Sequence, residues 1–285
     1  MTTSKTFTAT AAGAVGTDII SHVGTVTVTV DPTLTHAVIT VSTSDDDGPL
    51  ADAVRGATKQ ESTYQNLSCL TVRVPEVNGN TMTMGNSTFN FNGGIGQNFG
   101  VITGPVTGIH MSGGDISIGG RKVVSNGRVV AEQGTVVSGG VMGTIAVDVQ
   151  LPSDQSSVRL ETTSANLTVH GDLQDLDVNS VSGDLQARGV HTLRGNLTSG
   201  DVQVGRVDAR VDVHSVSGDI EIGAYNGTEF RASTVSGDVH VYATPAATGT
   251  IDATTVSGDV TTRGTSGRDD LHERVRTVSG KHRSR

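Results

Sequence analysis

The chain has 285 residues, of which 20 are Lys or Arg and 29 are Asp or Glu, so its net charge is −9. Glycine is frequent at 37 residues and aromatic residues make up only 3%, a composition that favours thin β layers over a large globular core. The single cysteine excludes an intrachain disulfide, and the excess of acid argues against nucleic acid, because phosphate contacts need clustered Lys and Arg.

The first 42 residues predict β-strands. Apolar and polar residues alternate around Phe7, over 26–30 and over 37–41, which is the pattern of a strand with one buried face. The segment Asp31–Thr35 between the last two stretches has turn residues, so we expect it to join them in a hairpin.

A short helix and a further strand complete the predicted amino-terminal region, residues 1–77. Pro49 can open a helix that reaches about Lys59, and residues 70–75 read as a strand that Pro75 ends. Cys69 lies beside apolar neighbours, and we expect it to be a small buried hydrophobe.

Residues 78–143 have a different composition, with short apolar pairs separated by Gly and Asn. A flexible low-complexity linker is one interpretation, and a second set of narrow β turns is the one we favour. Asn126-Gly127 lies between two valine pairs, which is a hairpin signal, and Ser112–Ile118 imitates the repeated phrase described next. Residues 145–152 then predict a strand that leads into the last region, 144–285.

Within residues 144–285 a five-residue phrase, [Ser/Thr]-Val-Ser-Gly-Asp, keeps returning. Its fourth residues, counting variant copies, lie at 165, 183, 200, 218, 237, 258 and 280, in steps of 17 to 22 residues. Strands joined by tight corners at that spacing predict an all-β fold, a single-stranded β-helix or β-solenoid of about seven rungs. The steps lengthen toward the carboxyl end, which predicts longer loops on one side there.

Three apolar columns follow from stacking the copies. Each copy has an apolar residue after the corner, another two positions on, and one before the corner, and Ile220 and Ile222 should be almost fully buried. The predicted columns are Leu167, Leu185, Val202, Ile220, Val239 and Val260; Val169, Ala187, Val204, Ile222, Val241 and Thr262; and Leu160, Val178, Val213, Ala232, Ala253 and Val275.

The corner residues Gly and Asp call for separate explanations. Recurrent Gly predicts a positive φ, which glycine adopts without steric cost. The recurrent Asp, at 184, 201, 219, 238 and 259, has two interpretations. Its carboxylate accepts backbone N–H groups in an Asx-type turn, or the stacked carboxylates collect cations. The nine-residue Gly-Asp spacing of calcium-binding β-rolls is absent, which argues against a specific calcium site.

The carboxyl-terminal end carries a prediction about partners. The repeat pattern stops after Ser279-Gly280, so the last rung is expected to be open. We expect the charged segment Arg268–Arg274 to cover it with Leu271 turned inward, and the alternative is an oligomer in which another chain completes this edge. The basic tail Lys281–Arg285 is interpreted as a solvated terminus.

No residues stand out as a catalytic, cofactor-binding or metal site. The known nucleotide, metalloprotease and hydrolase motifs are absent, and the nine histidines are scattered. His214 and His240 are expected to face solvent, and His170 has Asp172 nearby but no third ligand. The first 16 residues lack a signal peptide and no stretch has transmembrane length, so we expect a cytoplasmic protein without direct membrane insertion.

The phrase [Ser/Thr]-Val-Ser-Gly-Asp-[Val/Ile/Leu], repeated after a Val-x-Val-x-Leu-Pro strand, resembles the DUF4097 family, also called "putative adhesin" or toastrack-type β-repeat proteins. The resemblance covers about residues 145–281. It implies a single-stranded β-helix and a role in bacterial envelope stress or cell-surface anchoring.

The leading functional hypothesis is a non-enzymatic β-solenoid scaffold that presents a surface to other proteins. A glycan-binding module is the first alternative, although three Tyr, five Phe and no Trp offer few aromatic platforms. A β-helix carbohydrate-active enzyme is the second, and it would need paired carboxylates off the repeat pattern.

Overall fold

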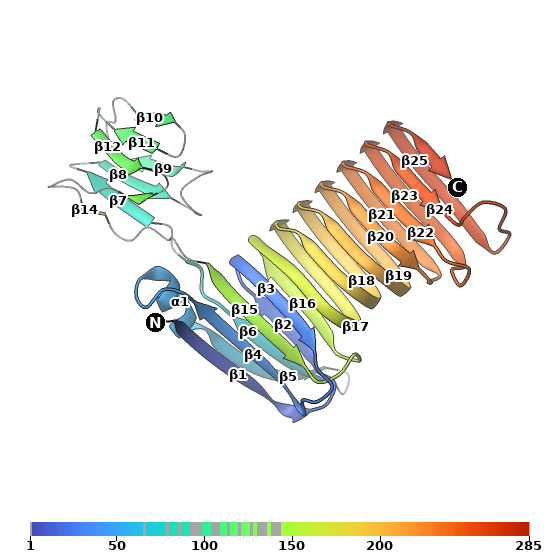
Figure 1. Cartoon of the computed structure of the whole chain (residues 1–285), viewed down its shortest axis with the longest axis horizontal. Coiled ribbons are helices and arrows are strands. Elements are labelled where there is room, and N and C mark those ends of the chain that lie inside the picture. The colour runs from blue at the N-terminus through green and yellow to red at the C-terminus, as the bar shows by residue number, and fades with distance from the viewer. Residues whose placement is uncertain are drawn as a thin grey trace.

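The structure of the chain is a computed structural model, shown in Figure 1. It describes residues 2–64, 67–77 and 144–284, together with the backbone of short strands between 80 and 137. Apart from one helix, the elements are all strands, and eighteen of them join in one sheet system. The prediction of an all-β solenoid is confirmed, with about six turns against the seven expected.

The repeats form two faces of parallel strands. Three of the first repeat strands cross from one face to the other without a break: β17 (Ser164–Ser182), β18 (Leu185–Ser199) and β19 (Val202–Ser217). The shorter β16 (Ser157–Thr162) lies on one face only, where it pairs with the second half of β17. The later rungs are split into two strands each: β20 (Ile220–Tyr225) and β21 (Glu229–Ser236), β22 (Val239–Ala243) and β23 (Gly249–Ser257), β24 (Val260–Arg263) and β25 (Leu271–Ser279), and finally β26 (His282–Ser284). In Figure 1 these rungs stack side by side from yellow to red.

The predicted apolar columns form the core between the two faces. Leu185, Val202 and Ile220 are Cα partners on successive strands, and the exposed fractions of Ile220 and Ile222 are 0% and 1%. In the column before the corner, Gly195 occupies the rung between Val178 and Val213. Since no rung holds more than a few of these residues, each depends on its neighbours for burial.

The amino-terminal strands are the first layers of the same stack. β2 (Gly16–Ile20) pairs in parallel with β16, and β3 (Val23–Val30) pairs in parallel with β17. Beyond them lie the strands that finish this end: β1 (Thr3–Ala12), β4 (His36–Thr43), β5 (Thr58–Tyr64), β6 (Leu67–Arg73) and β15 (Ile145–Leu151). Residues on both sides of the 78–143 segment therefore share one hydrophobic core.

The expected hairpin between β3 and β4 is wrong. Asp31–Thr35 does turn, with Leu34 donating to the carbonyl of Asp31 at 3.1 Å, but β15 lies between the two strands. β15 pairs in parallel with β3 and antiparallel with β4, and its alternating Ile145, Val147 and Val149 are buried. The sheet changes from parallel to antiparallel at this strand.

A helix covers the core at the amino-terminal end, as Figure 1 shows. Helix α1 (Pro49–Gly56) starts at the expected proline and buries Leu50, Ala53 and Val54 against the core cluster. It ends before the predicted Lys59, because Ala57 takes extended backbone angles and the chain continues directly into β5.

Between 80 and 137 the described strands pair only with one another. They form two small antiparallel sheets, one of β7 (Asn80–Met84), β8 (Ser87–Phe91), β9 (Phe99–Thr103) and β14 (Val136–Val137), the other of β10 (Ile109–Ser112), β11 (Asp115–Ile118), β12 (Arg121–Ser125) and β13 (Arg128–Val129). Asn126-Gly127 lies outside the described residues, but the strands flanking it pair antiparallel. Ser112 pairs with Asp115, so that copy of the phrase joins antiparallel strands instead of parallel rungs.

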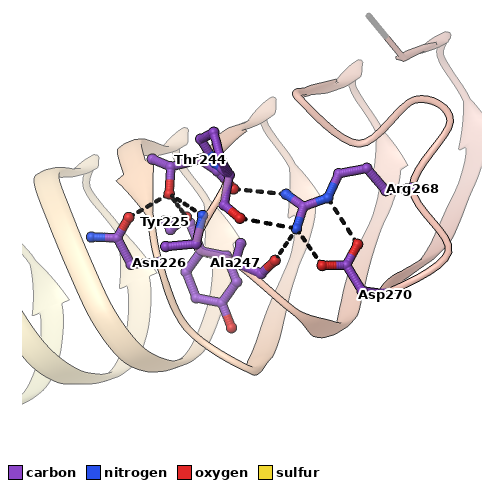
Figure 2. A network of polar contacts seen from close by, with 8 residues as sticks. Tyr225, Asn226, Thr244, Ala247, Arg268 and Asp270 are labelled. Carbon is purple, nitrogen blue, oxygen red and sulfur yellow. Dashed lines mark hydrogen bonds and ion pairs between the residues drawn. The ribbon is translucent and has the colours of Figure 1, made fainter.

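The longer loops expected toward the carboxyl end lie on one side and bind one another. Figure 2 shows Arg268 donating to the carbonyl groups of Thr244 and Ala247 while it pairs with Asp270 at 2.7 Å. The Thr244 hydroxyl in turn bonds Asn226 of the preceding rung. Tyr225 is fully buried beside this network, and burial raises the pKa of its phenol.

Candidate functional site

The corners of the solenoid are built from glycines whose backbones nearly touch. Gly183, Gly218 and Gly258 have φ angles of +135°, +136° and +156°, which confirms the predicted positive φ. A Cβ placed on Gly218 would lie 2.2 Å from the carbonyl oxygen of Gly200 in the rung before it. At Gly183, Gly218 and Gly258, glycine is thus needed both for its backbone angle and for the close approach of the neighbouring corner.

The corner aspartates connect successive rungs. Oδ1 of Asp184 accepts the backbone N–H of Asp201 at 3.0 Å, and Oδ1 of Asp201 accepts that of Asp219 at 2.9 Å. The series continues to Lys281, whose N–H donates to Asp259. The prediction of a local Asx-type turn needs correction, since the N–H groups bound belong to the following rung. Within the described residues, no group of three or more His, Cys, Asp or Glu could hold a metal ion.

The second residue of the phrase forms an exposed stripe of valines, which we call the valine stripe. Ser180, Ser215, Thr234 and Thr255 face inward and are buried, so the residue after each points outward. The exposed fractions are 53% for Val181, 51% for Val216, 49% for Val235, 45% for Val256 and 83% for Val278. Sequence reasoning missed this stripe, although its signal was present: a valine recurring out of phase with the inward columns.

A column of alternating charge runs along the outside of the face that ends in β25. Its members are Cα partners on successive strands: Asp18, Arg159, Asp177, Arg194, Asp212, Arg231, Asp252 and Arg274. Opposite charges on adjacent strands favour this register. At the first position Asp18 is half-buried, and this burial raises the pKa of its carboxyl group, an effect that Arg159 only partly offsets.

The carboxyl-terminal rung differs from the one expected. Leu271 is buried as predicted, but Leu271–Arg274 belongs to β25, which continues the stack on β23 instead of covering its end. The chain also continues past the corner, where β26 pairs with β24. Arg268 lies in the preceding loop and ties it to the rung below.

The core at this end is closed by an ion pair. Glu273 follows Ile251 in an otherwise apolar inward column, and His282 follows Val260 in another. Nε2 of His282 lies 2.7 Å from Oε1 of Glu273, and the buried Thr262 hydroxyl donates to the same oxygen at 2.6 Å. Charged residues that point inward at an edge protect it from further apolar stacking.

A hollow of about 300 Å³ lies among β1, β5 and β6, with Cys69 and Glu61 in its lining. Cys69 is half-buried, less than predicted, and its thiol contacts the carbonyl of Leu67 at 3.8 Å. Oε1 of Glu61 accepts the N–H of Thr10 and pairs with Lys59 at 3.0 Å, and these bonds hold the pKa of Glu61 below its usual range. The carboxylate is therefore already engaged within the protein.

The three histidines singled out in the sequence lie on β17, β19 and β22. His214 is exposed as expected and contacts Asp212 at 3.2 Å, while His240 is 43% exposed and lies 3.9 Å from Asp238. His170 is exposed on β17. Over the described ranges, no helix has the length and apolar character needed to span a bilayer.

Several solved structures resemble the chain over nearly its whole length. A "putative adhesin" from Bacteroides fragilis is 12% identical, with 99% of this chain and 97% of that chain covered and a TM-score of 0.42. A "putative cell adhesion protein" from Clostridium sporogenes is 8% identical, with 99% and 98% covered and a TM-score of 0.39. A "putative lipid binding protein" from Parabacteroides distasonis is 8% identical, with 98% and 96% covered and a TM-score of 0.39. No curated protein matches the chain.

The family described as Toastrack DUF4097 matches residues 27–284. That range runs from β3 to β26 and includes every copy of the repeated phrase, whose corner glycines and inward columns have the structural roles described above. The chain belongs to the Toastrack DUF4097 family.

Proposed function

We propose that this chain is a non-enzymatic binding scaffold of a bacterium, a stiff solenoid that presents its outer surface to another protein in envelope stress or adhesion. The observation that carries this proposal is the valine stripe, with Val181, Val216, Val235, Val256 and Val278 on one line of corners. Contiguous apolar surface rimmed by polar residues marks interaction sites on soluble proteins.

The stripe suits a partner with an extended apolar surface. Successive valines are separated by the spacing of paired strands, about 4.8 Å. Each one gives about 1 kcal/mol when its exposed half is removed from water, so several together supply useful affinity. Thr198 interrupts the row, while serines and aspartates of the same corners flank it and keep the surface soluble.

The two alternative functions have less support among the described side chains. A glycan site uses exposed aromatic rings, but Tyr225 and Phe230 pack edge to face in the core, with centroids 5.4 Å apart, and among the described side chains Tyr242 is the only exposed aromatic ring. A hydrolase needs free paired carboxylates. The repeated Asp184 and Asp201 instead accept backbone N–H groups.

Photo-crosslinking tests the proposed function. A photoreactive residue replaces Val235 in cells that express the chain, and the same residue at exposed Gln203, on another region of the surface, serves as the control. We expect a discrete crosslinked protein from position 235 only, which weakens when Val216→Thr and Val256→Thr are added. Identical products from both positions, or no effect of the threonines, would contradict the proposal.

A further inference from the structure

The edge formed by β25 has main-chain groups available for another strand. β25 pairs with β23 on one side, and among the described residues no strand pairs with its other side. The same holds for β26, which pairs with β24. An exposed strand edge offers a row of N–H and C=O groups, and strand addition is a common way of binding extended segments.

The outward side chains of this edge are basic. His272, Arg274 and Arg276 alternate along β25, and Arg283 follows on β26. The column of alternating charge ends here: Arg274 is 64% exposed and its guanidinium lies 4.0 Å from Asp252 in the preceding rung. Continuing the alternation would place a carboxylate on the far side of Arg274.

A second copy of the chain fits this edge poorly. If two β25 strands paired, each would bring Arg274 and Arg276 against the same arginines of the other, and like charges across a strand pair are destabilising. The inward side of the edge also offers a second copy only the partly buried Val275 beside the polar pair of Glu273 and His282.

We propose that the β25 edge binds, by strand addition, an extended segment of a partner protein in which acidic residues alternate with small polar ones. The acids face His272, Arg274 and Arg276, and the small polar residues lie above Glu273, Val275 and Thr277. A segment with this alternation places its acidic residues on the outward side and its small polar residues on the inward side whether it pairs parallel or antiparallel to β25, since successive side chains point to opposite faces. This inference rests on the proposed binding role but uses the edge of β25, which shares only Val278 with the valine stripe.

The test uses the full chain and a capped peptide in which Thr and Asp alternate over about the length of β25. We expect saturable binding that weakens about tenfold in the Arg274→Glu, Arg276→Glu double variant and weakens with added salt. The matched control is Arg188→Glu, an exposed arginine in the middle of the solenoid, which should change affinity by less than about twofold.

Two further peptides separate strand addition from simple charge attraction. A peptide with the same composition but with its Asp residues in one block, and an alternating peptide with N-methylated backbone amides, should each bind about tenfold more weakly. Hydrogen exchange should show slower exchange for the amides of 271–279 when the alternating peptide is bound.

Several outcomes would overturn the proposal: no binding, equal binding of the N-methylated peptide, or equal binding to the double variant. A dimer of the 29.3 kDa chain that the double variant abolishes would assign the edge to a second copy instead. Because crosslinking at Val235 reports another surface, a failed peptide test with intact crosslinking removes the edge proposal alone.

Discussion

At the scale of single residues, the corner phrase combines four separate tasks. Its Ser or Thr points inward and bonds a carbonyl, as Thr255 does to Gly237 at 3.0 Å. Its valine points outward, its glycine allows the chain to turn in contact with the next corner, and its aspartate binds the following rung. A buried hydroxyl without a partner would be costly, so each Ser or Thr at the inward position needs its carbonyl partner, whereas Leu197 fills the same position in one copy without a polar group.

Comparing substitutions at Gly13 and Gly218 distinguishes the cost of a positive φ from the cost of a steric contact. Gly13 has φ +80° with nothing within 4 Å of an added methyl group, whereas Gly218 has φ +136° and would place its Cβ against Gly200. We expect Gly13→Ala to cost about 1 kcal/mol in free energy of unfolding, the usual cost of a positive φ. Gly218→Ala should cost at least about twice that, because a rung must also shift. Urea unfolding measures both, and equal losses would show that the close corner contact is unimportant.

Asp18 gives a pH-dependent prediction. Burial raises the folded-state pKa of its carboxyl group above the ordinary 3.8, and its Oδ1 atom has no hydrogen-bond partner. The folded protein therefore binds this proton more tightly than the unfolded chain, and the stability it contributes below pH 3.8 is lost as pH rises through the folded pKa.

Asp18→Asn removes that titration. The difference in unfolding free energy between Asp18→Asn and the unaltered protein should shift in favour of the variant as pH rises from 3.8 toward neutrality. Urea denaturation at several pH values measures it. A constant difference across this range would mean that Asp18 ionises as easily in the folded protein as in the unfolded chain.

At the scale of elements, the repeats could be predicted and the two ends could not. The columns around Ile220 and Ile222 are visible in the sequence because each rung repeats the environment of the last. The hairpin between β3 and β4 was wrong because β15, more than a hundred residues later in the chain, inserts between them. Local turn signals at Asp31 carry no information about a strand that distant.

The carboxyl-terminal end was mispredicted for a related reason. A charged stretch that includes Glu273 looks like solvent-exposed surface, and only its alignment with Ile251 shows that the side chain occupies an inward column. The candidate surface was missed too: Val216 and Val235 belong to the repeated phrase, but the phrase alone does not say which way they point. Alternation counted from the inward serines places them outside.

The Glu273→Ile variant tests whether the contact between Glu273 and His282 protects the carboxyl-terminal end of the stack. The substitution restores the apolar column of Ile251 and removes the partner of His282, leaving an uncovered apolar end. We expect the variant to self-associate in light scattering at concentrations where the unaltered protein and Glu273→Gln remain monomeric. A monomeric Glu273→Ile protein would show that the ion pair does not protect this end.

At the scale of the whole molecule, residues 2–64, 67–77 and 144–284 form one stack that is closed differently at its two ends. Helix α1 covers the apolar core at one end, and the Glu273–His282 pair closes it at the other. Between them, each repeat adds one corner to the same line, with Thr163 and Thr198 in place of valine in two copies, so the pairing of strands sets the spacing of the exposed valines. A partner of the proposed kind would therefore meet a surface whose geometry is fixed before binding.

The distance between two spin labels along the corner line tests this account most directly. With Cys69 replaced by Ser, labels on Thr163→Cys and Val278→Cys occupy the same phrase position six rungs apart. Stacked rungs predict a single narrow distribution near 29 Å, about six strand spacings of 4.8 Å, allowing for the label arms. A broad distribution, or a distance far from that value, would contradict a continuous stiff solenoid and the valine stripe with it.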